Sequence, residues 1–288
     1  MRKIVLAFAA SVASFTAAAT ASAQQVAPGD WPHFNRDAGS SRYVPLDQIN
    51  TTNVTRLQPA WTFTPVAETP PGGPGPVGGA GGAGRGGRGG AGGVGAQVVP
   101  VVVNGVMYVP AGNVVAALDA ATGKEVWRYT STTGPASNRG VNYWAGSGTV
   151  SPRIVFTTRG PSGNSLVALD AATGRPSSGF GQNGIADLGA VGWSGVPVVF
   201  KNVLALGAST LETPQDPNTP GDTRGFDAIT GKLKWTFHSV PRPGEVGHET
   251  WLDNGWKDRS GTNIWNHHMT VDEQLGLLYL PISGPASN

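Results

Sequence analysis

Short runs of β-branched and other apolar residues alternate along this chain with turn-forming residues. Residues 98–103, 105–109 and 114–118 form three such runs, separated by Asn-Gly and Gly-Asn pairs, as expected for an antiparallel meander. Similar runs follow at 153–158, 166–169, 196–200, 203–206 and 277–280. No segment keeps a helical period for more than two turns. The pattern therefore predicts an all-β fold.

A repeat of about 50 residues is superimposed on this pattern. Its three copies are ALDAATGKEVW (117–127), ALDAATGRPSSGF (168–180) and GFDAITGKLKW (225–235). Their aspartates Asp119, Asp170 and Asp227 are spaced by 51 and 57 residues. Four short strands in a repeat of this length are typical of one blade of a β-propeller.

Each copy contains a predicted hairpin turn. Its glycine suits the backbone position with positive φ, and its aspartate can accept hydrogen bonds from the N–H groups of the turn. Trp127 and Trp235 follow the glycine by four residues, so each ring can pack against a neighbouring blade. The middle copy has Phe180 as the expected substitute, and Trp61 resembles the end of a further blade. We interpret these residues as structural rather than catalytic.

Two segments in the N-terminal third of the chain differ in composition from the rest. Residues 1–23 combine Arg2 and Lys3, an apolar stretch and the small residues Ala-Ser-Ala, which is the pattern of a cleaved secretory signal peptide. A membrane anchor is the alternative, but the apolar stretch is short for one. Residues 71–96 contain 15 glycines and predict a disordered insertion, although GRGGRGG resembles RNA-binding segments. We therefore expect a periplasmic mature chain, 24–288.

Charge and cysteine content narrow the possible partners. The chain has 20 Lys and Arg against 18 Asp and Glu, and without the signal peptide the two are equal. A broad attraction to nucleic acid or to an acidic membrane is therefore not expected. There is no cysteine, so this exported chain must rely on its core, and no C-x-x-C-H haem motif lies in this portion.

Four segments together resemble the quinoprotein dehydrogenases, which bind pyrroloquinoline quinone (PQQ) in an eight-bladed β-propeller. These are the opening segment 30–63, the repeat ALDAATGKEVW, RGVNYW (139–144) and PGEVGHETW (243–251). The resemblance implies that 24–288 is a partial propeller with about half of the eight blades. Because half a ring would leave two open sheet edges, we expect the natural protein to be longer.

The resemblance also implies a site for PQQ, a planar orthoquinone with three carboxylates. Arg139 matches the family's carboxylate clamp, for which the guanidinium fork is suited. Trp265, in SGTNIWNHH, resembles the tryptophan that stacks under the quinone. A surface ion pair for Arg139 and a core position for Trp265 are the structural alternatives. Further polar contacts to the cofactor are expected from Ser194, Ser209, Thr262 and Gln97.

The implied metal is Ca²⁺, which prefers oxygen ligands. Glu212 matches the family's calcium-ligand glutamate, with a solvated loop residue as the alternative. The second ligand is an Asn in relatives, where this chain has Gly284. The neighbours His267 and His268 should point to opposite sides of a strand, so we expect structural or substrate-pocket roles for them.

Two further departures concern catalysis. The alcohol enzymes of the family carry adjacent cysteines just before the RG motif, where this chain has Thr133 and Gly134. The family's catalytic base is an Asp in the following blade, expected beyond Asn288, so no catalytic base is assigned and this portion alone is expected to be inactive.

The resemblance therefore implies a PQQ-dependent oxidoreductase. Its substrate would be a small alcohol or sugar, and electrons would pass through PQQ to a quinone or cytochrome acceptor of the respiratory chain. Two alternatives share the repeat: a non-enzymatic propeller that serves as an envelope scaffold, and a cofactor-free sugar-binding propeller.

Overall fold

The computed structural model describes residues 26–64, 98–161, 163–189, 192–193, 195–209, 221–257, 262–265 and 268–285. The predicted signal peptide 1–23 and Gly-rich insertion 71–96 lie outside these ranges. The described chain is almost entirely β-structure, as predicted, with short 3-10 helices η1 (Val54–Arg56), η2 (His248–Thr250) and η3 (Leu252–Asn254). None of its helices is long and apolar enough to cross a membrane.

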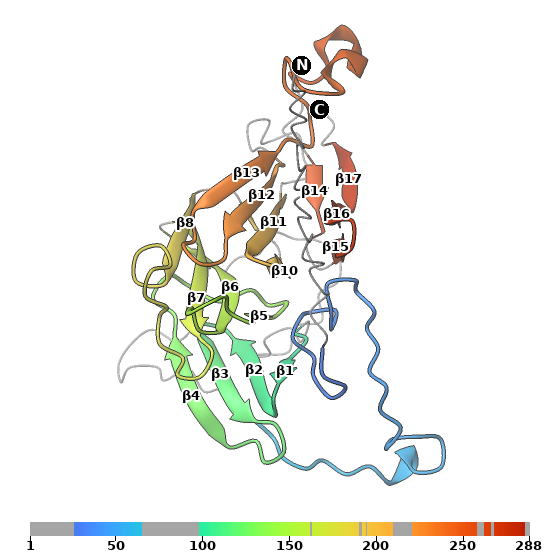
Figure 1. Ribbon diagram of the computed structural model, residues 1–288, viewed down its shortest axis with the longest axis vertical. Coiled ribbons are helices and arrows are strands. Elements are labelled where there is room, and N and C mark those ends of the chain that lie inside the picture. Colours follow the sequence, from blue (N-terminus) through green and yellow to red (C-terminus); the bar gives the residue numbers. More distant parts are fainter. Residues whose placement is uncertain are drawn as a thin grey trace, which may run out of the picture.

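Four sheet units follow one another along an arc, in the manner of propeller blades (Figure 1). The first unit is the meander β1 (Val101–Val103), β2 (Val106–Ala111), β3 (Val114–Asp119) and β4 (Glu125–Thr130). The second is β5 (Asn142–Trp144), β6 (Arg153–Gly160), β7 (Gly163–Asp170) and β8 (Ile185–Gly189). The third is β9 (Gly192–Trp193), β10 (Val198–Phe200), β11 (Val203–Ser209), β12 (Thr223–Asp227) and β13 (Leu233–Phe237).

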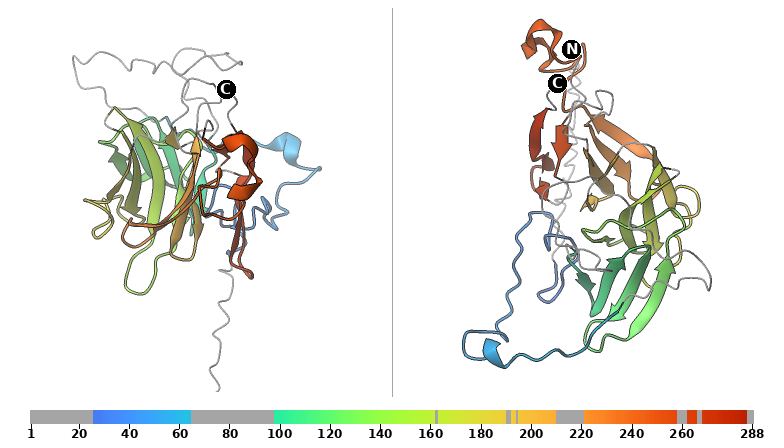
Figure 2. Two further views of the ribbon diagram at one scale, coloured as in Figure 1. Left: turned by 90° about the horizontal axis from the view of Figure 1, so that it is seen from above. Right: turned by 180° about the vertical axis from the view of Figure 1, so that it is seen from behind.

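The fourth unit consists of two antiparallel pairs. β14 (Thr262–Ile264) pairs with β17 (Ile282–Pro285), and β15 (Thr270–Asp272) pairs with β16 (Leu277–Tyr279). The first strands β1, β5 and β10 lie on the inner side of the arc, and β4, β8 and β13 lie on its outer side (Figures 1 and 2).

The core lies between neighbouring sheets. Side chains on a strand point alternately to its two faces. On β6, Ile154 and Phe156 pack towards the first sheet, whereas Val155 packs towards the third sheet. Because both faces of the second sheet are covered, the central part of β6 and β7 is buried on both sides.

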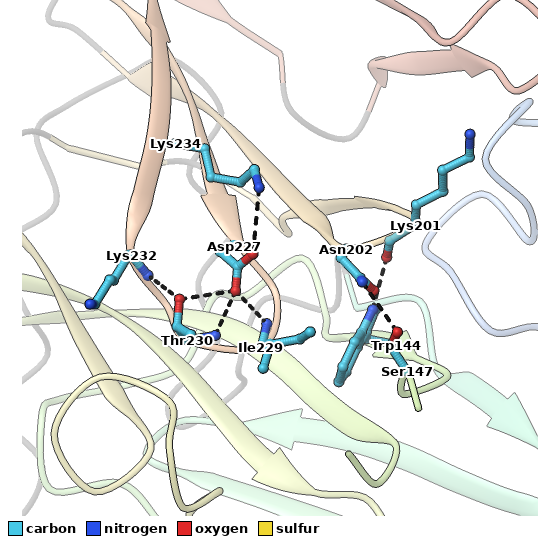
Figure 3. A network of polar contacts seen from close by, with 9 residues as sticks. All are labelled: Trp144, Ser147, Lys201, Asn202, Asp227, Ile229, Thr230, Lys232 and Lys234. Atoms are coloured by element: carbon cyan, nitrogen blue, oxygen red, sulfur yellow. Dashed lines mark hydrogen bonds and ion pairs between the residues drawn. The ribbon is translucent and has the colours of Figure 1, made fainter. Parts of the chain in front are cut away.

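The repeat aspartates form the predicted turns. The carboxylate of Asp119 accepts hydrogen bonds from the N–H and hydroxyl of Thr122, at 2.8 and 2.7 Å. Asp170 receives the same pair of bonds from Thr173, and Asp227 from Thr230 (Figure 3). Bonds to the charged form lower the pKa of the Asp119 carboxyl, Thr122 being the largest contributor. The aspartates are therefore structural, as interpreted from the sequence.

The carbonyl that follows the repeat aspartate receives an indole donor from an earlier segment of the chain at the first two turns. The indole N–H of Trp61 donates to the Ala120 carbonyl at 3.2 Å, and that of Trp127 to the Ala171 carbonyl at 2.9 Å. An added Cβ on Gly123 or Gly174 would lie 2.5 Å from the respective ring. Glycine is thus required at this position for two reasons: the turn needs a positive φ, and the tryptophan ring leaves no room for a Cβ.

The third junction uses a different donor. Phe180, the residue expected to replace the missing tryptophan, is fully buried beside Gly231. Its side chain, however, has no N–H group to donate. Arg153 takes over this role, and its Nη1 donates to the Ala228 and Ile229 carbonyls at 2.6 and 2.7 Å. The guanidinium also lies 5.3 Å from the ring of Trp144 and 5.5 Å from that of Phe180. Arg153 thus replaces the indole as donor, and Phe180 takes its place against the turn glycine.

A second contact joins the second and third units beside this one. The Trp144 indole N–H donates to the Lys201 carbonyl at 2.8 Å, and Asn202 donates to the hydroxyl of Ser147 at 3.2 Å (Figure 3). Trp235, in contrast, rests against Gly225 of its own sheet and stays 37 % exposed. It lines an apolar cavity of about 140 Å³ together with Val271 and Leu277 of the fourth unit.

The N-terminal segment ties the inner strands together. Trp31 pairs with Val102 of the first unit, and the Ala38 carbonyl accepts from the Val271 N–H of the fourth. Between them, the Asn142 side chain accepts from the Phe34 N–H at 2.7 Å and donates to the Pro197 carbonyl at 2.6 Å. This segment thus bonds to the first, second and fourth units directly, and Asn142 links it to the third.

We expect Arg153→Met to lower the free energy of unfolding by about 2–4 kcal/mol, because it leaves buried carbonyls without a donor. Arg175→Met, at an exposed arginine of the neighbouring turn, should change it by less than about 0.5 kcal/mol. Urea denaturation followed by circular dichroism measures both. Equal effects would show that the guanidinium adds nothing at this junction.

A pH dependence follows from His33. Burial lowers its pKa from 6.5 to about 4, although Asp37 raises it, and its Nδ1 is buried with no hydrogen-bond partner in the described chain. The unfolded chain therefore takes up this proton first, and the contribution of His33 to stability is lost as the pH falls from about 6.5 to about 4. The loss amounts to at most about 3 kcal/mol. In urea titrations at pH 7.5, 5.5 and 4.5, His33→Gln should show a shallower decline than wild type; parallel declines would contradict this assignment.

Candidate functional site

The innermost strand of three successive units is interrupted. In the second unit, residues 135–137 pair with the end of β6 and β5 pairs with its beginning, leaving 138–141 unpaired with it. In the third unit, β9 and β10 both pair with β11, and 194–197 lie between them. In the fourth, 265–269 separate β14 from β15. We call these three segments the inner-strand breaks.

The predicted site residues that the structure describes lie in or near these breaks, although they are far apart in sequence. Arg139 lies in the first break and Trp265 in the third. Ser209 ends β11 and pairs with Gly192, two residues before the second break, and Thr262 begins β14. β11 and β14 are in contact. Of the other predicted site residues, Ser194, Gln97 and Glu212 lie outside the described residues, as does His267.

Arg139 is held by its main chain. Its carbonyl accepts from the Val99 N–H at 3.2 Å, and its N–H donates to the Ser137 hydroxyl at 3.2 Å. The guanidinium has no hydrogen bond or ion pair within the part of the chain that the structure describes. Among these residues there is no carboxylate that pairs with Arg139, as the alternative of a surface ion pair would require. The guanidinium is therefore available to a ligand.

Buried polar atoms without partners lie on the neighbouring strands. The hydroxyl of Thr262 is buried, and so is that of Thr223 on β12; neither has a hydrogen-bond partner among the described residues. The indole N–H of Trp193, directly before the second break, is in the same state. Buried polar groups are nearly always hydrogen-bonded in native proteins. Of these atoms, the Thr262 hydroxyl lies on β14 directly before the third break, so it can donate to a polar ligand bound there.

Trp265 offers an accessible aromatic surface. It is 47 % exposed, whereas the core residue Trp144 is 2 % exposed. Its main-chain N–H donates to the Pro281 carbonyl at 3.4 Å, and its main-chain carbonyl accepts from the His268 N–H at 2.8 Å. The alternative of a core tryptophan does not describe this position. Its ring can instead stack on a planar ligand.

The segment that lacks the family's cysteines is packed against β6. Gly134 has φ +109°, and an added Cβ would overlap the Arg159 carbonyl. The hydroxyls of Thr133 and Thr158 are 2.8 Å apart. A cysteine side chain at 134 cannot be accommodated in this conformation. The departure therefore involves the backbone as well as the side chains.

The pattern in the sequence missed several residues of this region. Thr157 lies in the predicted strand 153–158 and donates to the Gly195 carbonyl at 3.0 Å, so it holds the second break. Asn142, in the RGVNYW segment, also bonds to the third unit. The alternation of Arg153, Thr157 and Arg159 along β6 was the signal that could have indicated the face on which Thr157 lies.

A cluster on the segment before β14 is also new. The ring of His238 lies 2.6 Å from the Glu245 carboxylate and 3.8 Å from that of Asp222, which Arg242 also approaches at 3.5 Å. Burial raises the pKa of Asp222, although the neighbouring cations lower it. The cluster anchors 238–245 to the third sheet. Among the described residues, no group of three or more His, Cys, Asp or Glu side chains could hold a metal ion.

The family is established by comparison with known proteins. Residues 31–288 match the PQQ family described as glucose/ethanol/alcohol dehydrogenase, β-propeller domain. The chain is 31 % identical to the quinohemoprotein alcohol dehydrogenase of Comamonas testosteroni over 276 residues, covering 87 % of this chain and 33 % of that protein. It is 29 % identical to the glycerol dehydrogenase large subunit of Gluconobacter oxydans, covering 91 % and 35 %.

Solved structures agree. A quinohemoprotein alcohol dehydrogenase of Pseudomonas putida superimposes with a TM-score of 0.65 at 25 % identity, over 90 % of this chain and 35 % of that one. The chain therefore belongs to the PQQ-dependent dehydrogenase family and has its β-propeller fold. It spans about a third of the length of the curated relatives it matches.

We expect Gly134→Ala to lower the melting temperature by at least 5 °C, because a Cβ would meet the Arg159 carbonyl and the φ is unfavourable. Gly244→Ala is the matched control, with φ +88° and no atom within 4 Å of an added Cβ. Its cost should be that of the backbone conformation alone. Scanning calorimetry compares the two; the same shift in both would mean that the contact with β6 is loose.

Proposed function

We propose that this chain is part of a periplasmic PQQ-dependent dehydrogenase that oxidises an alcohol or a sugar hydroxyl. Electrons would pass through PQQ to a quinone or cytochrome acceptor. The observation that carries the proposal is the position of Arg139 and Trp265 in equivalent inner-strand breaks, the first with an unpartnered guanidinium and the second with an accessible ring. The buried hydroxyl of Thr262 is on β14, in the same unit as Trp265.

The residues present fit the cofactor. When bound, PQQ would supply an acceptor for two electrons. Arg139 would bind one carboxylate through two N–H groups, and Trp265 would support the plane of the ligand. Ser209 and Thr262 would offer hydroxyls to its polar edge, as would Ser194 and Gln97. The chain thereby binds and orients the cofactor.

Calcium belongs to the proposal through Glu212, whose carboxylate is a suitable oxygen ligand. Gly284 supplies no side-chain oxygen where relatives have an Asn, so another oxygen would have to complete the metal site. No residue of 24–288 is assigned as the base for the hydroxyl proton.

The signal-peptide pattern supports a periplasmic location. N-terminal sequencing of the protein purified from its host should find Gln24 as the first residue; an intact N-terminus in the membrane fraction would favour the anchor instead.

A scaffold propeller would share the turns and the inter-sheet donors. It would have no need for an unpartnered Arg139 and a half-exposed Trp265 in the inner-strand breaks of the second and fourth units. This difference favours the dehydrogenase, and dye-linked activity on alcohols or glucose also separates it from a cofactor-free sugar-binding module.

The proposal predicts that PQQ with Ca²⁺ quenches the tryptophan fluorescence of the full-length protein from its host. Arg139→Gln should weaken PQQ binding at least tenfold, because charge-assisted hydrogen bonds are lost. Trp265→Ala should remove much of the quenching. Arg175→Gln, on the opposite end of the second sheet, should leave both unchanged. Absence of quenching in wild type, or equal binding by all variants, would refute the proposed function.

A further inference from the structure

One face of β6 follows the third unit from end to end. Arg153, at the start of the strand, bonds to the Ala228 carbonyl, and Val155 packs into the shared core. Thr157 donates to the Gly195 carbonyl in the second inner-strand break. Arg159, two residues further, therefore reaches the third unit at the level of that break.

The guanidinium of Arg159 lies beside Gly192. An added Cβ on Gly192 would be 3.4 Å from its Nη2, which is a close contact. Gly192 pairs with Ser209, so this cation stands next to a predicted cofactor contact. Thr157 and Arg159 thus flank the second break, one at Gly195 and the other at Gly192.

The main chain of Arg159 is joined to the segment that leads to Arg139. Its N–H donates to the Pro135 carbonyl at 3.2 Å, and its carbonyl is covered by Gly134. Ala136 pairs with Thr158 in the same ladder. Arg159 therefore lies where the approach to the first break meets the second break.

The side chain of Arg159 is exposed and has no hydrogen bond or ion pair within the described residues. The Asp222 carboxylate at this end of the third sheet is already approached by Arg242 and His238. A free guanidinium fork beside a serine and a glycine backbone is suited to a carboxylate ligand.

We propose that Arg159 is a second carboxylate-binding residue of the cofactor site. The inference rests on the proposed function, because PQQ supplies the carboxylates. Arg139 alone would balance one of the three negative charges, and Arg159 would bind a second carboxylate beside Ser209. Arg159 acts by positioning the ligand and takes no part in proton transfer.

Equilibrium titration of the full-length protein with PQQ and, separately, with its trimethyl ester tests this assignment. Arg159→Gln should bind PQQ about tenfold more weakly, because the interaction of the guanidinium with a carboxylate is lost. It should bind the ester as wild type does, because the ester carries no carboxylate with which Arg159 could interact. Arg159→Lys should recover part of the affinity for PQQ. Arg175→Gln is the control for removal of an exposed arginine, and thermal melting confirms that each variant is folded.

Arg139→Gln and Trp265→Ala, titrated in parallel, separate the two proposals. If both weaken PQQ binding while Arg159→Gln does not, the role of Arg159 is overturned and the proposed function stands. Equal losses for PQQ and its ester in Arg159→Gln would also overturn it, because the effect would not involve the carboxylates. If neither Arg139→Gln nor Trp265→Ala weakens binding, the proposed function fails and the inference fails with it.

Discussion

The arrangement of the sheets depends on one buried acceptor in each repeat, the carbonyl that follows the repeat aspartate. The turn withdraws this carbonyl from its own ladder, so a donor must come from outside the unit. Trp61, Trp127 and Arg153 supply that donor at three consecutive junctions. Trp61 and Trp127 also pack their rings against the turn glycine, and Phe180 does so at the third junction. Each junction therefore combines a hydrogen bond to the turn with a ring packed on its glycine.

These junctions lie at one end of the sheets, away from the inner-strand breaks. The donors meet the turns at one end, and the inner strands can therefore break at the other end without separating the units. β6 connects the two ends, with Arg153 at the junction and Thr157 beside the second break. The same strand thus contributes to the packing of the second unit on the third and holds the second break in place.

Much of the fold could be predicted from the sequence, because the turn chemistry is local. The spacing of Asp119, Asp170 and Asp227 indicated blades, and the loss of a tryptophan at Phe180 was visible. Arg153 could not be recognised as its replacement, since the contact joins residues 75 positions apart. The inner-strand breaks were also missed, because pairings of two or three residues leave no hydrophobic period. Arg139 and Trp265 were found through family resemblance rather than through any pattern of burial.

The arginine junction has a consequence for how such repeats can diverge. A tryptophan at this junction can be exchanged for phenylalanine at little cost only when a guanidinium already reaches the carbonyl, because the reverse order passes through a chain with an unpaired buried acceptor. The two changes are therefore ordered in evolutionary time. A blade that has acquired the arginine is released from the tryptophan, and its outer strand can then vary in length and sequence, as the loop around Phe180 does here.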